Sequence, residues 1–243
     1  MAKVGSTATT EIVRAFIKNT DYPIERDYMF HKRFGVHHVH YMRDLRKKWD
    51  VKIENYRTIS MTRDLVGRNI SHFFNTSANP DDKTGAHWNI GNKEDVLSKD
   101  LDYLLHFFYH EVSEENHLKA SKWFDTEYLP EVGINVYDIP FDHMKGYKFM
   151  SPDRLIIRTE DLSVAGGDAI SKMLGRKFNM SYRPKGFFPK IGANRWYGNI
   201  YKRFCDVPVP QKYVDMMYDC KTMRHFYTKE EIQSFKKKWT QSY

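Results

Sequence analysis

The sequence predicts an α/β fold in which a largely parallel sheet is covered by helices on both faces. Short runs of β-branched and aromatic residues alternate along the chain with stretches whose apolar residues recur at helical spacing. No internal repeat and no Pro/Gly-rich linker interrupts the 243 residues. We therefore expect a single domain that spans residues 1–243.

The first half of the chain contains two predicted strands and two predicted helices. A helix is expected over 7–19, where the apolar residues fall on one face. The runs FGVHHVHY (34–41) and RTISMT (57–62) are short, apolar and bounded by charges, which is typical of strands. The clearest amphipathic pattern predicts a continuous helix from Leu97 to Val112.

The second half continues the alternation. We expect a helix over 119–129, strands at INVYDIP (134–140) and RLIIRTE (154–160), and a short helix that Gly166-Gly167 opens and that ends near Leu174. A capping box at 228–231 predicts that the chain ends in a helix.

Composition limits the partners and the compartment. Lys and Arg total 39 against 31 Asp and Glu, which gives a formal charge of +8 and favours an anionic partner. The two cysteines, Cys205 and Cys220, are too few for a disulfide framework and favour a reducing, cytoplasmic compartment. The alternative is a lumenal or Golgi location, if an anchor segment was removed upstream. No apolar stretch is long enough to span a membrane, and the lysine-rich patches at 46–48 and 236–238 are too short to indicate nucleic-acid binding.

A small-residue loop at the N-terminus is a candidate anion site. The segment Lys3-Val4-Gly5-Ser6-Thr7-Ala8 lies where a strand would turn into a helix, so its backbone N–H groups could close around an anion. A Walker A loop carries its lysine directly before the Ser/Thr, whereas Lys3 precedes the glycine. This order resembles the 5′-phosphosulfate loop of sulfotransferases that use 3′-phosphoadenosine 5′-phosphosulfate (PAPS).

A second segment resembles the 3′-phosphate motif of the same family. In Thr62-Arg63-Asp64-Leu65-Val66-Gly67-Arg68-Asn69-Ile70-Ser71, an arginine follows a predicted strand and a serine lies eight residues on, in the next helix. The resemblance implies that Arg63 and Ser71 clasp one phosphate, and a guanidinium fork with a hydroxyl is chemically suited to that role.

Further matches extend the resemblance over most of the chain. The segment 155–162 is similar to the family's strand that ends in Glu-Asp-Leu, followed by a helix that closes on Leu174-Gly175. The segments 123–137 and 194–197 resemble the capsular-polysaccharide branch. In the wider family, a segment similar to 194–201 approaches the nucleotide, which implies that Arg195 reaches a phosphate and that Trp196 or Tyr197 stacks on adenine, the alternative for each being a place in the core.

The resemblance implies a three-layer α/β/α, P-loop-like sulfotransferase fold with a mainly parallel central sheet. The family places a strand before the phosphosulfate loop, and only Met1 and Ala2 precede Lys3, so we expect this chain to lack that first strand.

The implied activity is transfer of a sulfuryl group from PAPS to a carbohydrate hydroxyl by in-line displacement. Lys3 would neutralise charge on the leaving group, 3′-phosphoadenosine 5′-phosphate (PAP), while Gly5, Ser6, Thr7 and Ala8 hold the phosphosulfate. The first candidate for the general base is His40, at the end of a predicted strand, then His38 on the same face, and then an acidic residue, Glu25 or Glu11.

Other function classes remain open on the sequence. The alternatives are a P-loop-type nucleotide phosphotransferase and a catalytically inactive nucleotide- or anion-binding protein. No metal is expected, because the cluster formed by His106, His110, Glu111 and His117 has no third ligand at a fixed spacing and is typical of a polar helix face.

Overall fold

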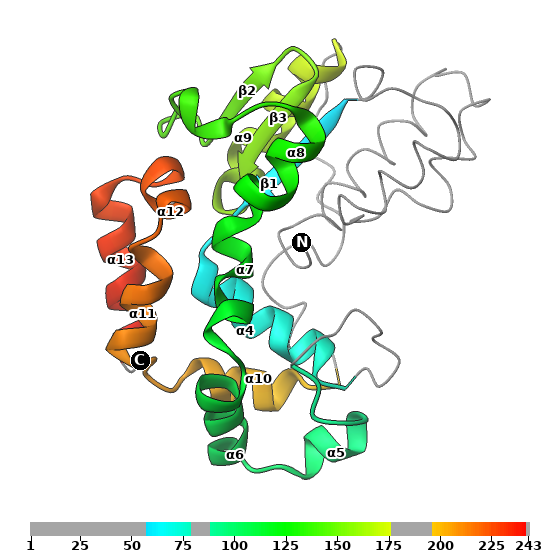
Figure 1. Ribbon diagram of the computed structural model, residues 1–243, viewed down its shortest axis with the longest axis vertical. Coiled ribbons are helices and arrows are strands. Elements are labelled where there is room, and N and C mark those ends of the chain that lie inside the picture. The colour runs from blue at the N-terminus through cyan, green and yellow to red at the C-terminus, as the bar shows by residue number, and fades with distance from the viewer. Residues whose placement is uncertain (1–56, 79–87, 176–195, 242–243) are drawn as a thin grey trace, which may run out of the picture. The chain divides into compact units, whose positions relative to one another are not determined.

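The computed structural model of the protein describes residues 57–78, 88–175 and 196–241 (Figure 1). The chain forms two compact units, each built from two separate stretches of sequence. Within the described residues, unit 1 consists of 57–63 and 123–175, and unit 2 of 64–78, 88–122 and 196–241. The helix predicted over 7–19 and the strand predicted over 34–41 lie outside the described residues.

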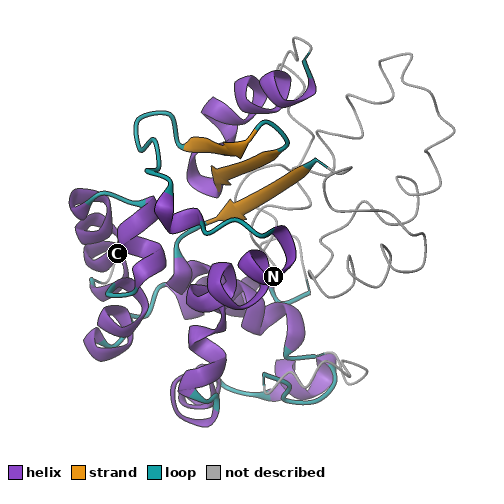
Figure 2. Ribbon diagram, turned by 45° about the horizontal axis from the view of Figure 1, so that its top comes forward, coloured by secondary structure: helices purple, strands orange, loops and turns teal. Residues whose placement is uncertain are grey.

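Unit 1 contains a three-stranded sheet in the order β1-β3-β2 (Figure 2). The strands β1 and β3 are parallel, and β2 is antiparallel to β3. Two predicted strands, 57–62 and 154–160, are confirmed as β1 and β3, whereas β2 was not predicted. The bounds are Thr58–Thr62 for β1, Tyr147–Ser151 for β2 and Arg154–Arg158 for β3.

The central strand β3 is buried along its whole length. Leu155, Ile156 and Ile157 have no exposed surface, and since successive side chains of a strand point to opposite faces, both faces of this strand are covered. The helix α9 (Leu162–Leu174) packs on β3 and β2. The described part of the chain is therefore a mixed α/β structure, as expected, with one parallel and one antiparallel strand pairing.

Two predictions in unit 1 are wrong. The run 134–140 is not a strand, because Asn135 accepts a hydrogen bond from the Tyr137 N–H at 3.3 Å and caps the 3₁₀-helix η5 (Val136–Asp138). The helix α9 begins at Leu162, ahead of the two glycines, since the 3₁₀-turn η6 (Thr159–Asp161) leads directly into it.

The segment after residue 114 is helical but not uniform. The predicted helix 119–129 corresponds to α7 (Glu114–Trp123), the π-helix η4 (Phe124–Tyr128) and α8 (Leu129–Val132). Gly133 ends α8 with a left-handed backbone at φ 75°.

The described residues of unit 2 form helices joined by loops, and none of them lies in a strand. Its core is an aromatic cluster in which Phe73, Phe74, Phe108 and Phe204 are almost fully buried and pack edge-to-face. Besides α7, its elements are α4 (Leu65–Thr76), α5 (Lys93–Ser98), α6 (Leu101–His106), the π-helix η3 (Phe107–Glu111), α10 (Gly198–Cys205), α11 (Gln211–Tyr218), α12 (Lys221–Phe226) and α13 (Lys229–Thr240).

The continuous helix predicted from Leu97 to Val112 is broken. Lys99 and Asp100 have extended backbones, and the Asp100 carboxylate accepts a hydrogen bond from the Tyr103 N–H at 2.7 Å, which starts α6. The helical spacing of the apolar residues continues across this break, so the pattern does not reveal where one helix ends and the next begins. The capping box at Thr228 and Glu231 is confirmed by both reciprocal hydrogen bonds.

None of the helices in the described stretches combines the length and the apolar content needed to span a lipid bilayer.

Candidate functional site

The candidate site in unit 1 is the edge of the sheet at which the parallel strands β1 and β3 end. The register pairs Thr62, the last residue of β1, with Arg158, the last residue of β3. The Thr159 hydroxyl donates a hydrogen bond to the Thr62 carbonyl at 3.0 Å and joins the two strand ends. In open α/β sheets, ligands bind outside the carboxyl ends of the strands, so this edge is where a site is expected.

Arg63 follows directly after β1 at this edge, as the sequence predicts. Its side chain is half-buried, so part of its surface is accessible. Arg158 at the neighbouring strand end has a different role: it pairs with Asp161 and donates to the His143 carbonyl at 3.1 Å, and its side chain is 5% exposed. Arg158 thus stabilises the turn beside the edge, whereas Arg63 has the accessible position.

Ser71 lies in α4, the helix that begins two residues after Arg63. It is half-buried, and its hydroxyl makes no hydrogen bond with any described residue. Ser71 belongs to unit 2 and Arg63 to unit 1. Their predicted shared role in holding one phosphate stays a prediction.

The residue between the strand and the helix, Asp64, fixes the start of α4. Its buried carboxylate accepts hydrogen bonds from the Val66 and Gly67 N–H groups at 3.0 and 3.3 Å. The same carboxylate accepts from the Tyr218 hydroxyl at 2.5 Å and from Trp239 Nε1 at 2.9 Å. Since Asp64 already occupies these helix N–H groups, they are not available to an anion.

Sequence reasoning missed the roles of Asp64 and Thr159. An aspartate immediately before an apolar helical pattern is a typical N-cap, so the first could have been found. The Thr159–Thr62 contact joins residues 97 positions apart and leaves no local pattern.

Unit 2 contains a second polar cluster, around a histidine named in the sequence analysis. His117 is 2% exposed; its Nε2 lies 2.9 Å from the Phe108 carbonyl and its Nδ1 lies 2.8 Å from the Tyr213 hydroxyl. Because a carbonyl only accepts, Nε2 carries the proton and Nδ1 accepts from Tyr213. Burial, together with the positive charge of Arg68, lowers the pKa of His117 to about 4, against the ordinary 6.5.

The other histidines of that predicted cluster lie apart from this buried position. His106 and His110 are neighbours on the surface, with ring centroids 4.9 Å apart, and His106 Nε2 lies 3.3 Å from a Glu111 carboxylate oxygen. Within the described ranges, no group of three or more His, Cys, Asp or Glu side chains is arranged to hold a metal ion.

The two aromatic residues of the 194–197 segment differ in environment. Tyr197 is 4% exposed and packs against Phe74 with ring centroids 5.6 Å apart, which places it in the unit 2 core. Trp196 is 36% exposed. Of the two interpretations, the core role fits Tyr197.

Most predicted site residues lie outside the described residues. For these the roles given above stay predictions: Lys3, Gly5, Ser6, Thr7, Ala8, His38, His40 and Arg195.

Comparison with protein families, with curated proteins and with solved structures found no match to this chain.

Proposed function

We propose that this protein is a PAPS-dependent sulfotransferase that transfers a sulfuryl group to a carbohydrate hydroxyl, on a three-layer, P-loop-like α/β/α fold. One observation carries the proposal: Arg63 follows β1 at the carboxyl edge of the parallel strand pair, and the helix α4 that carries Ser71 begins immediately after it. This is the strand–turn–helix context that the 3′-phosphate motif requires.

The residues present at the turn suit a phosphate dianion. Arg63 offers a planar guanidinium with several N–H donors, and such charge-assisted bonds are the stronger class of hydrogen bond. The neighbouring Asp64 is negatively charged but buried, and its oxygens already accept four hydrogen bonds. Its charge is therefore compensated from within unit 2, which lessens its repulsion of an anion next to Arg63.

The second strand end supports the same proposal. The family's late strand ends in Glu-Asp-Leu before a helix, and here β3 is followed by η6, with Glu160 and Asp161, and then by α9 from Leu162. This helix ends at Gly175, where the backbone is left-handed at φ 69°. The order of strand and helix in both quoted segments supports the proposal, although β3 ends at Arg158, before the Glu-Asp-Leu sequence.

The remaining chemistry falls to residues named from the sequence. Lys3 and the backbone of Gly5, Ser6, Thr7 and Ala8 would hold the phosphosulfate and neutralise the leaving group, and Arg195 would contribute to a phosphate. His40, or else His38, would take the proton of the acceptor hydroxyl, a role usually worth about 10²- to 10⁴-fold in rate.

The decisive experiment is calorimetric titration of the full chain with PAP and, separately, with ADP. These nucleotides differ at the 3′-phosphate, so PAP should bind more tightly if Arg63 and Ser71 recognise that group. Arg63→Ala should weaken PAP by about 10- to 150-fold, the worth of a lost charge-assisted hydrogen bond, and should leave ADP nearly unchanged.

Arg57→Ala is the matched control. Arg57 immediately precedes β1, at the strand's opposite end, and its Nε is paired with Asp153 at 3.0 Å on the surface, so its loss should not change either affinity. Equal affinities for PAP and ADP would refute the proposal. A preference for ATP with magnesium would indicate the phosphotransferase, and PAP binding without sulfuryl transfer from PAPS would indicate an inactive nucleotide-binding protein.

A further inference from the structure

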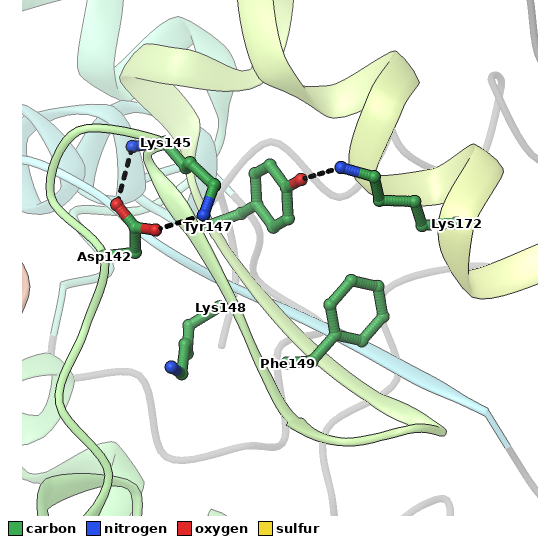
Figure 3. Close-up of a pocket in the computed structure, with 6 residues that line it drawn as sticks. All are labelled: Asp142, Lys145, Tyr147, Lys148, Phe149 and Lys172. Carbon is green, nitrogen blue, oxygen red and sulfur yellow. Dashed lines mark hydrogen bonds and ion pairs between the residues drawn. The ribbon is translucent and has the colours of Figure 1, made fainter.

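A groove on unit 1 gathers three lysines around the start of β2, which is an outer strand of the sheet as far as the described residues go. It encloses about 300 Å³, at the lower end of the range for ligand sites. Figure 3 shows the rings of Tyr147 and Phe149 on one side of β2, Lys148 on the other, and Lys172 reaching the Tyr147 hydroxyl from α9. This lysine groove is lined by Asp142, Lys145, Tyr147, Lys148, Phe149 and Lys172.

The charged side chains of the groove are held in place but keep unused donors. Lys172 Nζ lies 2.8 Å from Asp168 and 3.0 Å from the Tyr147 hydroxyl, and Lys145 Nζ lies 2.7 Å from Asp142. Each ammonium has three N–H donors, so both retain at least one. Lys148 makes no hydrogen bond or ion pair with any residue that the structure describes, and it contributes a whole ammonium group.

The groove also presents acceptors and an aromatic surface. Asp142 lines the groove, and Asp168 lies beside it as the partner of Lys172. Both carboxylates have spare lone pairs, and both have lowered pKa values because of hydrogen bonds from Lys145 and Lys172 respectively. The half-buried Phe149 ring stands edge-to-face to Tyr147, with centroids 6.1 Å apart. The site therefore combines ammonium donors, carboxylate acceptors and a partly exposed phenyl ring.

This combination discriminates between anionic partners. Three lysines against two aspartates leave an excess of one positive charge, whereas nucleic-acid binding draws on many phosphate neutralisations. Carboxylates in the site would repel closely spaced phosphates but can accept hydrogen bonds from hydroxyl groups. A ligand rich in hydroxyls, with a negative charge at intervals, satisfies all three kinds of group.

The groove lies near the carboxyl ends of β1 and β3, where Arg63 follows β1. Because β2 is antiparallel to β3, its first residue, Tyr147, is paired with Ile157 beside the end of β3, and Arg158 is paired with Thr62. The start of β2 is thus two strand positions from the end of β1, roughly 10 Å at the usual strand spacing. A chain-like ligand in the groove would lie close to the edge at which the nucleotide is proposed to bind.

We propose that the lysine groove binds an acidic oligosaccharide, with Lys145, Lys148 and Lys172 contacting its carboxylate or sulfate groups. As an acceptor site this inference rests on the proposed function; as a binding site it is tested independently.

The test is calorimetric titration with a hyaluronan hexasaccharide, which carries a carboxylate on every second sugar. Its carboxyl-reduced, uncharged counterpart serves as the neutral probe, and single-stranded oligouridylate as the nucleic-acid probe. The acidic hexasaccharide should bind, and the reduced one should bind about fivefold more weakly, which is the most that one exposed charge pair contributes.

Lys148→Gln is the cleanest variant, because no described residue depends on Lys148 for a bond. It should weaken the acidic hexasaccharide by about fivefold, Lys148→Arg should restore the affinity, and the double variant with Lys172→Gln should lose more. Lys212→Gln is the matched control, since it removes the same charge from an exposed position of α11 in unit 2 and should change nothing.

Measuring PAP on the same samples separates this inference from the proposed function. Lys148→Gln should leave PAP affinity unchanged, and Arg63→Ala should leave hexasaccharide affinity unchanged. Hexasaccharide binding without PAP binding would overturn the proposed function alone. Equal affinity for the acidic and reduced sugars, or no effect of Lys148→Gln, would overturn the inference. If oligouridylate binds more tightly than the hexasaccharide and is equally sensitive to Lys148→Gln, the groove is a nucleic-acid site instead.

Discussion

Acidification from pH 7.5 to pH 5 should destabilise unit 2 by about 2 kcal/mol through His117 alone. In the folded protein the pKa of this imidazole is lowered to about 4, whereas an exposed histidine in the unfolded chain titrates near 6.5. A neutral imidazole is required in the fold, so this stability is fully present above pH 6.5 and is lost as the pH falls toward 4. The full contribution of His117 to the free energy of unfolding, between a pH above 6.5 and a pH below 4, is about 3 kcal/mol.

The first cause is burial, which penalises the charged imidazolium, and the described hydrogen bonds around the ring fit its neutral form. Nδ1 faces the Tyr213 hydroxyl, and that oxygen already accepts from Asn69 Nδ2 at 3.0 Å. A proton on Nδ1 would therefore turn the Tyr213 hydroxyl hydrogen away from its only described acceptor. Arg68 adds a positive charge to the same region.

Urea unfolding at pH 7.5 and pH 5, followed by circular dichroism, measures the effect. His117→Gln removes the titrating group, so the loss of stability between the two pH values should be about 2 kcal/mol smaller than in the wild type. His106→Gln is the control, because it removes a histidine whose side chain is 63% exposed rather than a buried one. If His117→Gln and the wild type lose stability in parallel, the buried-histidine reasoning is wrong.

Two further substitutions test the turns beside the candidate site. Asp64→Asn should cost about 2–4 kcal/mol in free energy of unfolding, because an amide cannot accept all four hydrogen bonds of the buried carboxylate. The control Asp100→Asn, at the exposed cap of α6, should cost a few tenths of a kcal/mol. Similar losses for both variants in urea unfolding would show that Asp64 is an ordinary cap. Gly146→Ala should cost about 1–3 kcal/mol in free energy of unfolding for its left-handed φ of 69°, and more because the new methyl group would meet the Asp161 side chain. It should therefore lower the melting temperature further than Gly133→Ala, at a position with φ 75° and open space around it. A smaller shift for Gly146→Ala would contradict the geometry.

Local patterns predicted the elements whose signals are contained in a few residues. The strands β1 and β3 are short β-branched or aliphatic runs, and the capping box of α13 has both of its partners within four residues. The break at Asp100 and the 3₁₀-helix capped by Asn135 went unrecognised, because in both places a side chain bonds to the backbone within an apolar pattern that continues across it. Propensity and periodicity do not record such bonds.

The candidate site was predictable only in part. The position of Arg63 after a strand and of Ser71 in the following helix follows from the local pattern. The anchoring of Asp64 by Tyr218 and Trp239 joins residues 154 and 175 positions apart, and the sheet order that places Tyr147 at the edge near Arg63 depends on pairings across the unit. No window of sequence contains those contacts.

The bond between Asp64 and Trp239 also sets an order of events during synthesis. Unit 2 is assembled from an early and a late stretch of the chain, with a stretch of unit 1 made in between. Ribosomes add about 5–20 residues per second, so about 9–35 s pass between the synthesis of Asp64 and that of Trp239, 175 positions later. The aromatic residues around Phe73 and Phe108 lack α10 and α11, against which they pack, until residue 218 has been added, and the nascent chain is in most need of a chaperone in that interval.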